Sequence, residues 1–372
     1  PPLPLPGSVG TTCQFPSLLS CQLAGRMELE SLLSSDDQLI PFCNFSAISE
    51  HRSDHASLVW WSNSVFLPSI AIVGIFFNLL NIAILTTNRA ARRMPSWSLL
   101  VSLALCDSLF LLFALLETTP LSVSAVAASP LLNRLYLHSA LYIRTAASTF
   151  YKSSVLIVVA FNIERYVYVV WPLRSQRICT DRLSRIAVAA WFPISLASSL
   201  QWPLCYEVTA CQEPSTNQSM HFILLKQSAA AQAYYRAMDF LALFGFNILP
   251  ICMLLFLNTR LILTLKRVAA DDLQRKQGML HQSTQTSRRT ANAMLFAVVG
   301  VLLVCLGPQA PARLLFSRLG QYHPTAVVYA CITQQLVFLN ASLNFALYCV
   351  VSRRYRTLMR STVHRLLSSV GC

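Results

Sequence analysis

The chain has 372 residues, of which 55% are hydrophobic and only 12% are charged, and its mean hydropathy is +0.52. This composition excludes an ordinary soluble protein and indicates a membrane protein. The net charge of +14 does not indicate nucleic-acid binding, because most of the 29 lysines and arginines lie in short loops between apolar runs rather than along one soluble face.

Residues 1–63 are rich in Pro and Ser and carry more acidic than basic side chains. We expect them to form a flexible extracellular tail. An Asn-x-Ser sequon at Asn44 in this tail and a second one at Asn217 predict glycosylation, which requires that both lie outside the cell.

Seven apolar segments follow, each near or above the roughly 20 residues that a helix needs to cross a bilayer. They cover about residues 65–87, 98–119, 139–170, 185–205, 237–264, 290–316 and 325–350. Basic residues cluster at every second connection, which places those loops inside and the N-terminus outside the cell. The sequence therefore predicts an all-α protein with a seven-transmembrane helix bundle over residues 64–350, spanning the plasma membrane several times.

The remaining residues, 351–372, are basic, with apolar side chains at helical spacing. This pattern predicts a cytoplasmic amphipathic helix on the inner leaflet, followed by a short tail. A disordered basic tail is the alternative.

A carboxylate, Asp107, lies near the middle of the second segment, where it needs partners or a cation. Four polar side chains lie at a similar depth by residue counting, namely Asn78, Ser154, Asn340 and Asn344. These oxygen ligands suit a hydrated Na⁺, but a water-filled polar cluster without an ion explains them equally well. The twelve cysteines follow no zinc or redox spacing, so no other metal site is expected.

A charged pair, Glu164 and Arg165, interrupts the end of the third segment at the cytoplasmic surface. An arginine that a neighbouring acid holds in one state and releases in another forms a two-state latch. Ordinary snorkelling of both side chains to the membrane surface is the alternative for an isolated pair.

Several motifs recur in a fixed order along the segments. They are Asn78; Asp107; Glu164-Arg165-Tyr166 with Pro172 beyond it; Trp191; Pro250; Cys305-Leu306-Gly307-Pro308; and Asn344-Phe345-Ala346-Leu347-Tyr348. Over about residues 65–368 the chain thereby resembles the rhodopsin-like family of G-protein-coupled receptors. It departs from the family pattern at Leu306, where the family has tryptophan, and at Phe345, where the family has proline.

The resemblance implies roles for several of these residues. Coupling to a heterotrimeric G protein and the switch between states would involve Glu164, Arg165, Tyr166, Pro172, Asn258 and Tyr348. The movable hinges would be Pro250 and the Cys305 to Pro308 motif, since proline frees backbone groups and loosens a helix.

The ending Asn344-Phe345-x-x-Tyr348-Cys349 is similar to that of FMRFamide-type and myosuppressin-type neuropeptide receptors. Orphan receptors that sense aromatic amino acids share this ending. The resemblance thus implies a neuropeptide ligand, with a small aromatic ligand as the alternative.

The resemblance also leads us to expect a disulfide between the third segment and the second outer loop, but Ala140 stands at the matching position. Cys205 and Cys211 are expected either to pair with each other or to pair with Cys43 or Cys331.

Polar and ionisable residues near the outer ends of the segments are the ligand-binding candidates. They are Glu117, Arg144, Asp239, Gln309, Arg313 and Gln334. A cavity with both signs of charge suits a peptide with an amidated or arginine-bearing end. The alternative is that Glu117 pairs with Arg144, and Asp239 with Arg313, merely to satisfy one another. Ala147 stands where amine receptors carry a ligand-binding aspartate, and segment seven has no lysine for retinal, which argues against amines and light.

We therefore predict a receptor without enzymatic chemistry that binds an extracellular peptide and activates a heterotrimeric G protein. A membrane transporter is the alternative from a different class, but seven segments without an internal repeat fit that architecture poorly. An intramembrane hydrolase would need a nucleophile and a base at one depth, which the sequence does not supply.

Overall fold

The structure is a computed structural model and describes residues 56–92, 96–122, 130–212, 219–275, 300–301, 303–312, 315, 324–351 and 353–370. Several residues singled out above, Asn44, Asn217, Arg313 and Cys43, lie outside this part of the chain. Tyr348 and Cys211 are described by their backbone only.

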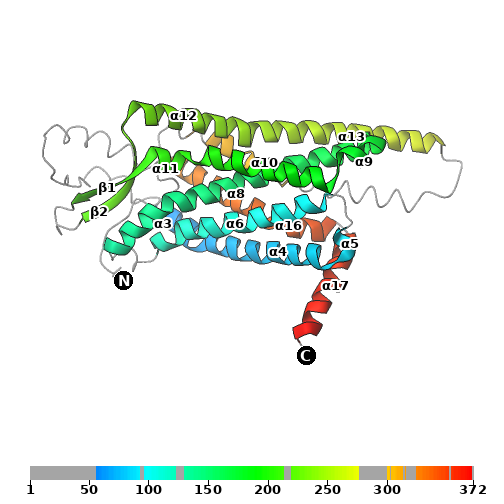
Figure 1. Cartoon of the computed structure of the whole chain (residues 1–372), viewed down its shortest axis with the longest axis horizontal. Coiled ribbons are helices and arrows are strands. Elements are labelled where there is room, and N and C mark those ends of the chain that lie inside the picture. The colour runs from blue at the N-terminus through cyan, green and yellow to red at the C-terminus, as the bar shows by residue number, and fades with distance from the viewer. Residues whose placement is uncertain are drawn as a thin grey trace.

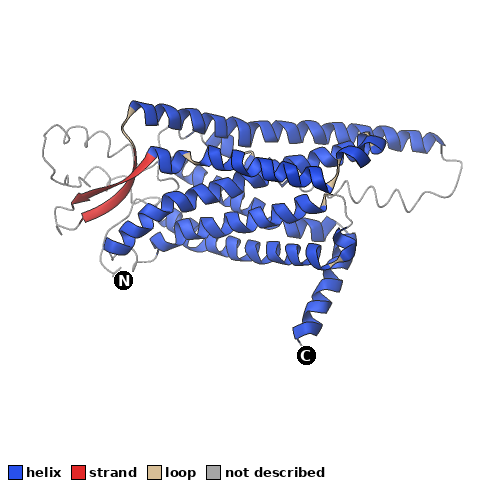
Figure 2. Cartoon of the chain, in the orientation of Figure 1, coloured by secondary structure: helices blue, strands red, loops and turns tan. Residues whose placement is uncertain are grey.

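The described chain is helical apart from one hairpin (Figures 1 and 2). In chain order the elements are α3 (Ala56–Trp61), η1 (Ser62–Phe66), α4 (Leu67–Thr87), α5 (Arg89–Arg92), α6 (Trp97–Ser122), α8 (Pro130–Val170), α9 (Pro172–Ile178), α10 (Asp181–Ser199), α11 (Gln201–Cys205), β1 (Tyr206–Gln212), β2 (Ser219–Leu225), α12 (Ala229–Leu243), η2 (Phe244–Ile248), α13 (Leu249–Arg275), α16 (Pro324–Val351) and α17 (Arg353–Val370). The antiparallel strands β1 and β2 extend from one end of the bundle, and α17 leaves the opposite end (Figure 1). We refer to these as the hairpin end and the α17 end.

Six stretches of the described chain are long and apolar enough to cross a membrane. They are Leu58–Thr87, Trp97–Thr118, Arg134–Val170, Asp181–Cys205, Ala229–Thr264 and Thr325–Ala346. They correspond to six of the seven predicted segments. The other predicted segment, 290–316, falls partly outside the described residues, and its residues 303–312 form a helix with a turn at Gly307 and Pro308.

Local sequence signals explain where several helices begin. Proline occupies the first position of α8, α9 and α16, where its missing amide hydrogen costs nothing and its fixed φ suits a helix. The side chain of Thr180 caps α10 by accepting a hydrogen bond from the Leu183 amide at 3.3 Å. Ser228 caps α12 in the same way.

Two helices contain one wide π-helical turn, η1 at the start of the first span and η2 in the fifth. The turn η2 lies next to Pro250, which cannot donate a backbone hydrogen bond, and the amide of Leu249 reaches back to the carbonyl of Phe244. The helix around Pro308 is also irregular, since the backbone forms a turn there. Both predicted hinge prolines thus lie at breaks in regular helix.

A close approach of α4 to α16 joins the first and last spans. Gly74 permits it, because a Cβ atom there would overlap the side chain of Ser342 and lie 2.7 Å from Cδ1 of Leu111. The Ser342 hydroxyl donates to the Ile70 carbonyl of α4 at 3.2 Å. This contact holds the helices that carry Asn78 and Asn344 side by side.

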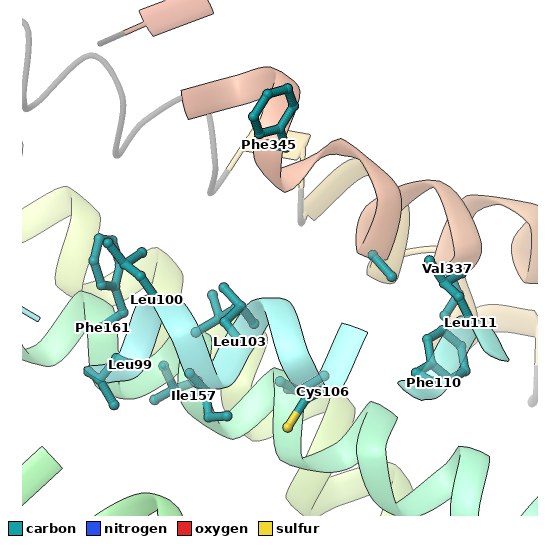
Figure 3. Close-up of a cluster of buried hydrophobic side chains, with 14 of the residues drawn as sticks. Leu99, Leu100, Leu103, Cys106, Phe110, Leu111, Ile157, Phe161, Val337 and Phe345 are labelled. Carbon is teal, nitrogen blue, oxygen red and sulfur yellow. The ribbon is translucent and has the colours of Figure 1, made fainter. Parts of the chain in front are cut away.

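The main apolar core lies where α4, α6, α8 and α16 meet, and Figure 3 shows part of it, including Leu103, Cys106 and Ile157. Large apolar side chains such as Ile72, Phe76 and Phe256 point outward and are more than half exposed. In a bilayer these side chains face lipid. The apolar outer surface and the length of the spans therefore both indicate a membrane domain.

Candidate functional site

The carboxylate of Asp107 is the centre of a polar group inside the bundle and is only 1% exposed. The hydroxyl of Ser154 in α8 donates to its Oδ1 at 2.6 Å, and the amide of Asn344 in α16 donates to its Oδ2 at 2.6 Å. Three helices therefore meet on one buried acid. The sequence predicted these three residues as members of one network.

The other two predicted members, Asn78 and Asn340, lie on α4 and α16. Asn78 of α4 is fully buried and donates to the Ala341 carbonyl at 2.9 Å, while its side-chain oxygen has no hydrogen-bond partner in the part of the chain that the structure describes. Asn340 is half-buried and precedes Asn344 by one helical turn, so it lies on the same face of α16. The unpartnered oxygen of Asn78 and the Asp107 carboxylate provide the hard oxygen donors that a cation such as Na⁺ prefers.

At the α17 end, two hydroxyl groups hold the carboxylate of Glu164. Ser96, directly before α6, donates to one oxygen, and Ser184 of α10 donates to the other. Both serines are buried, so the acid ties the ends of α6, α8 and α10 together. The guanidinium carbon of Arg165 lies 5.0 Å from the centre of the Phe161 ring. The sequence had predicted a latch between Glu164 and Arg165, and it gave no signal for the two serines.

Ser96 has a backbone φ of +62°, which is unusual for a residue other than glycine. Its carbonyl accepts the first hydrogen bond of α6, from Leu100 at 3.1 Å. Its side chain is thereby turned toward Glu164 instead of capping its own helix. Strained backbone of this kind persists where surrounding contacts hold it in place.

The residues after Glu164 form a compact connection to α10. The rings of Tyr166 and Trp171 pack edge to face at 5.9 Å, and Pro172 begins α9. The thiol of Cys179 lies 3.9 Å from the Glu164 carbonyl oxygen. Burial, and then the Glu164 carboxylate, raise the pKa of this thiol above its usual value, which favours its protonated form.

Asn258 of α13 is buried, and its amide donates to the Leu254 carbonyl one turn earlier at 2.6 Å. Its side-chain oxygen has no hydrogen-bond partner among the described residues. Asn258, which the resemblance assigns to G-protein coupling, thus makes its hydrogen bond within its own helix.

At the hairpin end, Glu117 of α6 and Arg144 of α8 lie opposite each other, with 3.4 Å between Oε1 and Nε. The guanidinium also covers the ring of Trp202 at 4.0 Å, and its Nη1 is buried without a hydrogen-bond partner among the residues that the structure describes. The hydroxyl of Tyr136 donates to the backbone carbonyl of Glu117, which fixes the end of α6 against α8.

The other predicted ligand residues are more scattered. Asp239 on α12 and Gln334 on α16 are both half-buried. The neighbour of Gln334, Gln335, donates to the Ser62 hydroxyl at 2.7 Å and so connects α16 to η1. The structure thus brings two of the predicted residues, Glu117 and Arg144, into direct contact.

A buried lysine in α8 was not among the predicted site residues. Lys152 is only 5% exposed, and its ammonium donates to the Ser198 carbonyl at 2.9 Å and to the Ser199 hydroxyl at 3.1 Å, both in α10. It also lies 5.3 Å from the centre of the Phe246 ring. Its position inside an apolar segment was a signal in itself, because ionisable residues at this depth are rare and functional.

Comparison with known proteins assigns this arrangement to a family. Residues 77–348 match the profile of the 7 transmembrane receptor (rhodopsin family). The chain belongs to the rhodopsin family of seven-transmembrane receptors. It is therefore a multi-pass membrane receptor rather than an enzyme, with a seven-helix bundle, an extracellular ligand and a G-protein partner. The match includes the sixth predicted segment, which completes the bundle.

Individual relatives in this family bind different kinds of ligand. The chain is similar to the allatostatin-A receptor of Bombyx mori, at 22% identity over 337 residues, covering 89% of this chain and 88% of that receptor. It is similar to neuromedin-U receptor 2 of Mus musculus, at 27% identity over 310 residues, covering 81% and 74%. It is also similar to adenosine receptor A2b of Bos taurus, at 28% identity over 249 residues, covering 64% and 70%.

In this rhodopsin-family receptor, Leu306 replaces the usual hinge tryptophan and is almost fully buried. A polar bridge lies nearby. The hydroxyl of Tyr151 in α8 is 2.9 Å from Oε1 of Gln309 and 3.4 Å from Oδ1 of Asn247 in η2. The bridge joins α8 to both irregular helices, at Pro250 and at Pro308. Gln309, predicted as a ligand residue, thus also takes part in a contact between helices.

Phe345, where the family has proline, fills a different role in this receptor. Its ring stacks on Phe77 of α4 at 5.2 Å and packs edge to face against Tyr355 of α17 at 6.0 Å. The Tyr355 hydroxyl donates to Asn81 of α4 at 2.5 Å. The predicted amphipathic helix is therefore present as α17, and aromatic packing together with this hydrogen bond docks its first turn on α4.

The receptor anchors its hairpin to α8 without a disulfide at Ala140. A second apolar cluster joins them and consists of Tyr136, Leu137, Ala140, Leu141, Cys205, Tyr206 and Ile223. We call this the hairpin cluster. Apolar packing between the hairpin and α8 thus takes the place of the covalent bond.

The suggested pairing of Cys205 with Cys211 is not formed, since Cys205 is a free, buried thiol, and so is Cys331. The reason is the strand between them. Cys211 lies within β1, so six residues of nearly extended chain put it about 20 Å from Cys205, far beyond the ~7 Å that a disulfide permits between Cα atoms.

Proposed function

We propose that this receptor binds an extracellular neuropeptide, most closely of the FMRFamide type, and activates a heterotrimeric G protein. The observation that carries the peptide assignment is the Glu117–Arg144 pair, which offers both signs of charge beside aromatic rings at one end of the bundle. Such a site suits the polar end of a peptide better than a uniformly apolar pocket does.

The orientation of the bundle in the membrane follows from the distribution of its basic residues. The α17 end carries the basic residues of α5, α9 and α17, and basic loops remain on the cytoplasmic side. The hairpin end then faces outward in the plasma membrane, together with the tail of residues 1–63 and the sequons at Asn44 and Asn217. Residues 64–350 form the receptor domain, and residues 351–372 form the cytoplasmic helix and tail.

Two of the relatives above, the allatostatin-A and neuromedin-U receptors, are named for peptides, which supports the peptide assignment. The adenosine receptor is named for a small aromatic molecule and supports the alternative ligand class. The partly buried tyrosine and tryptophan rings near Arg144 suit either an aromatic side chain of a peptide or a free aromatic compound.

Activation requires that the ligand bind one arrangement of the helices better than another. A change from 1:99 to 99:1 in favour of the active state needs a difference of about 5.5 kcal/mol in binding free energy. The helices whose regular backbone is interrupted at Pro250 and Pro308 are the movable elements. The hydroxyl of Tyr151, which lies near Asn247 and Gln309, connects both to α8. Release of Glu164 by Ser96 and Ser184 then frees the end of α8 and Arg165 for the G protein.

A sodium ion near Asp107 belongs to this proposal. The residues fit a hard cation, since the buried Asp107 carboxylate and the Ser154 hydroxyl beside it are oxygen donors. A bound ion would supply positive charge that stabilises the carboxylate in the packed, inactive arrangement of α6, α8 and α16.

A peptide screen in cells that report calcium and cyclic AMP tests the proposed function. Amidated peptides, including Phe-Met-Arg-Phe-amide, and free aromatic amino acids should be applied to the wild type and to Arg165→Ala and Asp107→Asn. We expect a peptide to signal through the wild type and to lose most of its effect with Arg165→Ala. Signalling by aromatic amino acids alone would shift the assignment to the small-ligand alternative.

A further inference from the structure

The Glu117–Arg144 pair is looser than an ion pair that exists only to satisfy its two members. Charge-assisted hydrogen bonds between such groups measure about 2.7–2.9 Å, whereas Nε of Arg144 and Oε1 of Glu117 are 3.4 Å apart. The two side chains remain 14% and 18% exposed. The pair is therefore accessible in part and has spare hydrogen-bonding capacity.

Two hydrogen-bond donors in the same cluster have no acceptor within the described part of the chain. Nη1 of Arg144 and Nε1 of Trp202 are both buried without a partner among the described residues, and the guanidinium lies 4.0 Å over the Trp202 ring. Buried polar groups in proteins are nearly always hydrogen-bonded, so an unpaired one calls for an explanation. A ligand that brings an acceptor oxygen to this place would satisfy them.

Aromatic rings surround these donors on the side of the hairpin. Trp202 packs against Tyr206 at 5.3 Å and against Tyr235 at 6.2 Å, and the two tyrosines meet at 5.5 Å. These rings come from α11, β1 and α12, so three elements of the hairpin end meet at Trp202, whose ring lies under the Arg144 guanidinium. A group bound there lies against flat apolar surface on one side and a charged pair on the other.

We propose that Glu117 and Arg144 bind the C-terminal carboxamide of the peptide ligand, an inference that rests on the proposed function. A carboxamide offers one acceptor oxygen for the unpaired donors of Arg144 and Trp202, and its NH₂ group offers donors for Glu117. A free carboxylate would satisfy Arg144 but be repelled by Glu117. An arginine side chain would pair with Glu117 but be repelled by Arg144 and leave both donors unpaired.

Paired peptides differing in one group test this assignment. Phe-Met-Arg-Phe-amide and a library of peptides of two to eight residues should be made in carboxamide and free-acid forms and tested for G-protein activation and for binding to purified receptor in nanodiscs. We expect the carboxamide form of any active peptide to be about 10- to 100-fold more potent, the range that hydrogen bonds to charged groups provide.

Glu117→Gln should change the affinities for the carboxamide and free-acid peptides in opposite directions. A folding defect would lower both affinities, so this variant separates recognition from folding. It removes the charge that repels a carboxylate, so the free acid should gain about tenfold in affinity while the carboxamide loses affinity. Arg144→Gln should weaken both forms. Two exposed residues of the hairpin end, Arg134 in α8 and Glu207 in β1, provide the matched controls Arg134→Gln and Glu207→Gln, which should change neither form.

The outcomes separate the two proposals. Equal potency of the two forms, or a Glu117→Gln variant that weakens both equally, would overturn the carboxamide assignment while leaving a peptide receptor intact. Failure of every peptide in either form, beside activation by free aromatic compounds, would overturn the proposed peptide function and this assignment with it.

Discussion

Replacing Ser96 or Ser184 with alanine should raise signalling in the absence of ligand. Each serine donates a hydrogen bond to the Glu164 carboxylate, and each comes from a different neighbour of α8. Loss of either bond weakens the connection of α8 to α6 or to α10 at the α17 end. If G-protein coupling requires that this end opens, the active arrangement becomes more populated.

The size of the effect follows from the charge of the acceptor. A hydrogen bond to a charged group contributes about 1.5–3 kcal/mol, which corresponds to about a ten- to hundredfold change in an equilibrium constant. A receptor that is about 1% active without ligand would become about 10% active or more. The two substitutions share one acceptor, so the effect of the double variant should be less than the product of the single ones.

The backbone conformation of Ser96 leads to a second prediction, which concerns the stability of its variants. Its φ of +62° is strained for serine and alanine but not for glycine. Ser96→Gly and Ser96→Ala lose the same hydrogen bond and should raise basal signalling equally. The glycine variant should nevertheless be more stable to heat than the alanine variant, by about 1 kcal/mol.

Nucleotide exchange on purified G protein, without ligand, measures the basal activity, and thermal unfolding of the receptor measures the stability. Ser175→Ala is the matched control, because this buried hydroxyl at the same end donates to Pro172 within its own helix, at 2.7 Å. It should leave basal exchange unchanged. Unchanged or reduced exchange in both Ser96→Ala and Ser184→Ala would refute the role of the two serines.

Three further substitutions test other contacts. Tyr206→Ala should destabilise the hairpin end by about 3–5 kcal/mol, seen as a lower melting temperature and less receptor at the cell surface, whereas Tyr206→Phe should retain the packing. Tyr151→Phe should cost about 1 kcal/mol of stability and change basal nucleotide exchange, since it removes the bridge to Gln309, while the exposed Tyr142→Phe should change neither. Tyr355→Phe should leave the buried Asn81 oxygen unpaired, so hydrogen exchange should become faster in α17 than in the rest of the bundle.

Residue counting along apolar segments predicted the spans and the depth of their polar groups. Asp107, Ser154 and Asn344 meet in the structure because helices of known rise place residues counted from the membrane surface at a common level. The irregular backbone at Pro250 and Pro308 followed from the chemistry of proline alone. Periodic features of this kind are visible in a single sequence.

Contacts made by isolated side chains from distant segments were not predictable. Ser96 and Ser184 are ordinary serines in sequence, and only the packing of α6 and α10 against α8 turns them toward Glu164. The contact of Arg144 with Trp202 likewise depends on how α11 lies against α8, which no periodic pattern in the sequence shows. The predicted pairing of Cys205 with Cys211 was wrong because an extended strand separates these two residues, which are close in sequence.

We expect the buried contacts at the α17 end of α8 to control the activation of a G protein. The most direct measurement is guanine-nucleotide exchange on heterotrimeric G proteins by the purified receptor in nanodiscs, with an activating peptide, comparing the wild type with Arg165→Ala. We expect the peptide to accelerate exchange by the wild type and to have little effect on Arg165→Ala while still binding it. Equal acceleration by both proteins, or none by the wild type with a peptide that binds, would contradict this role.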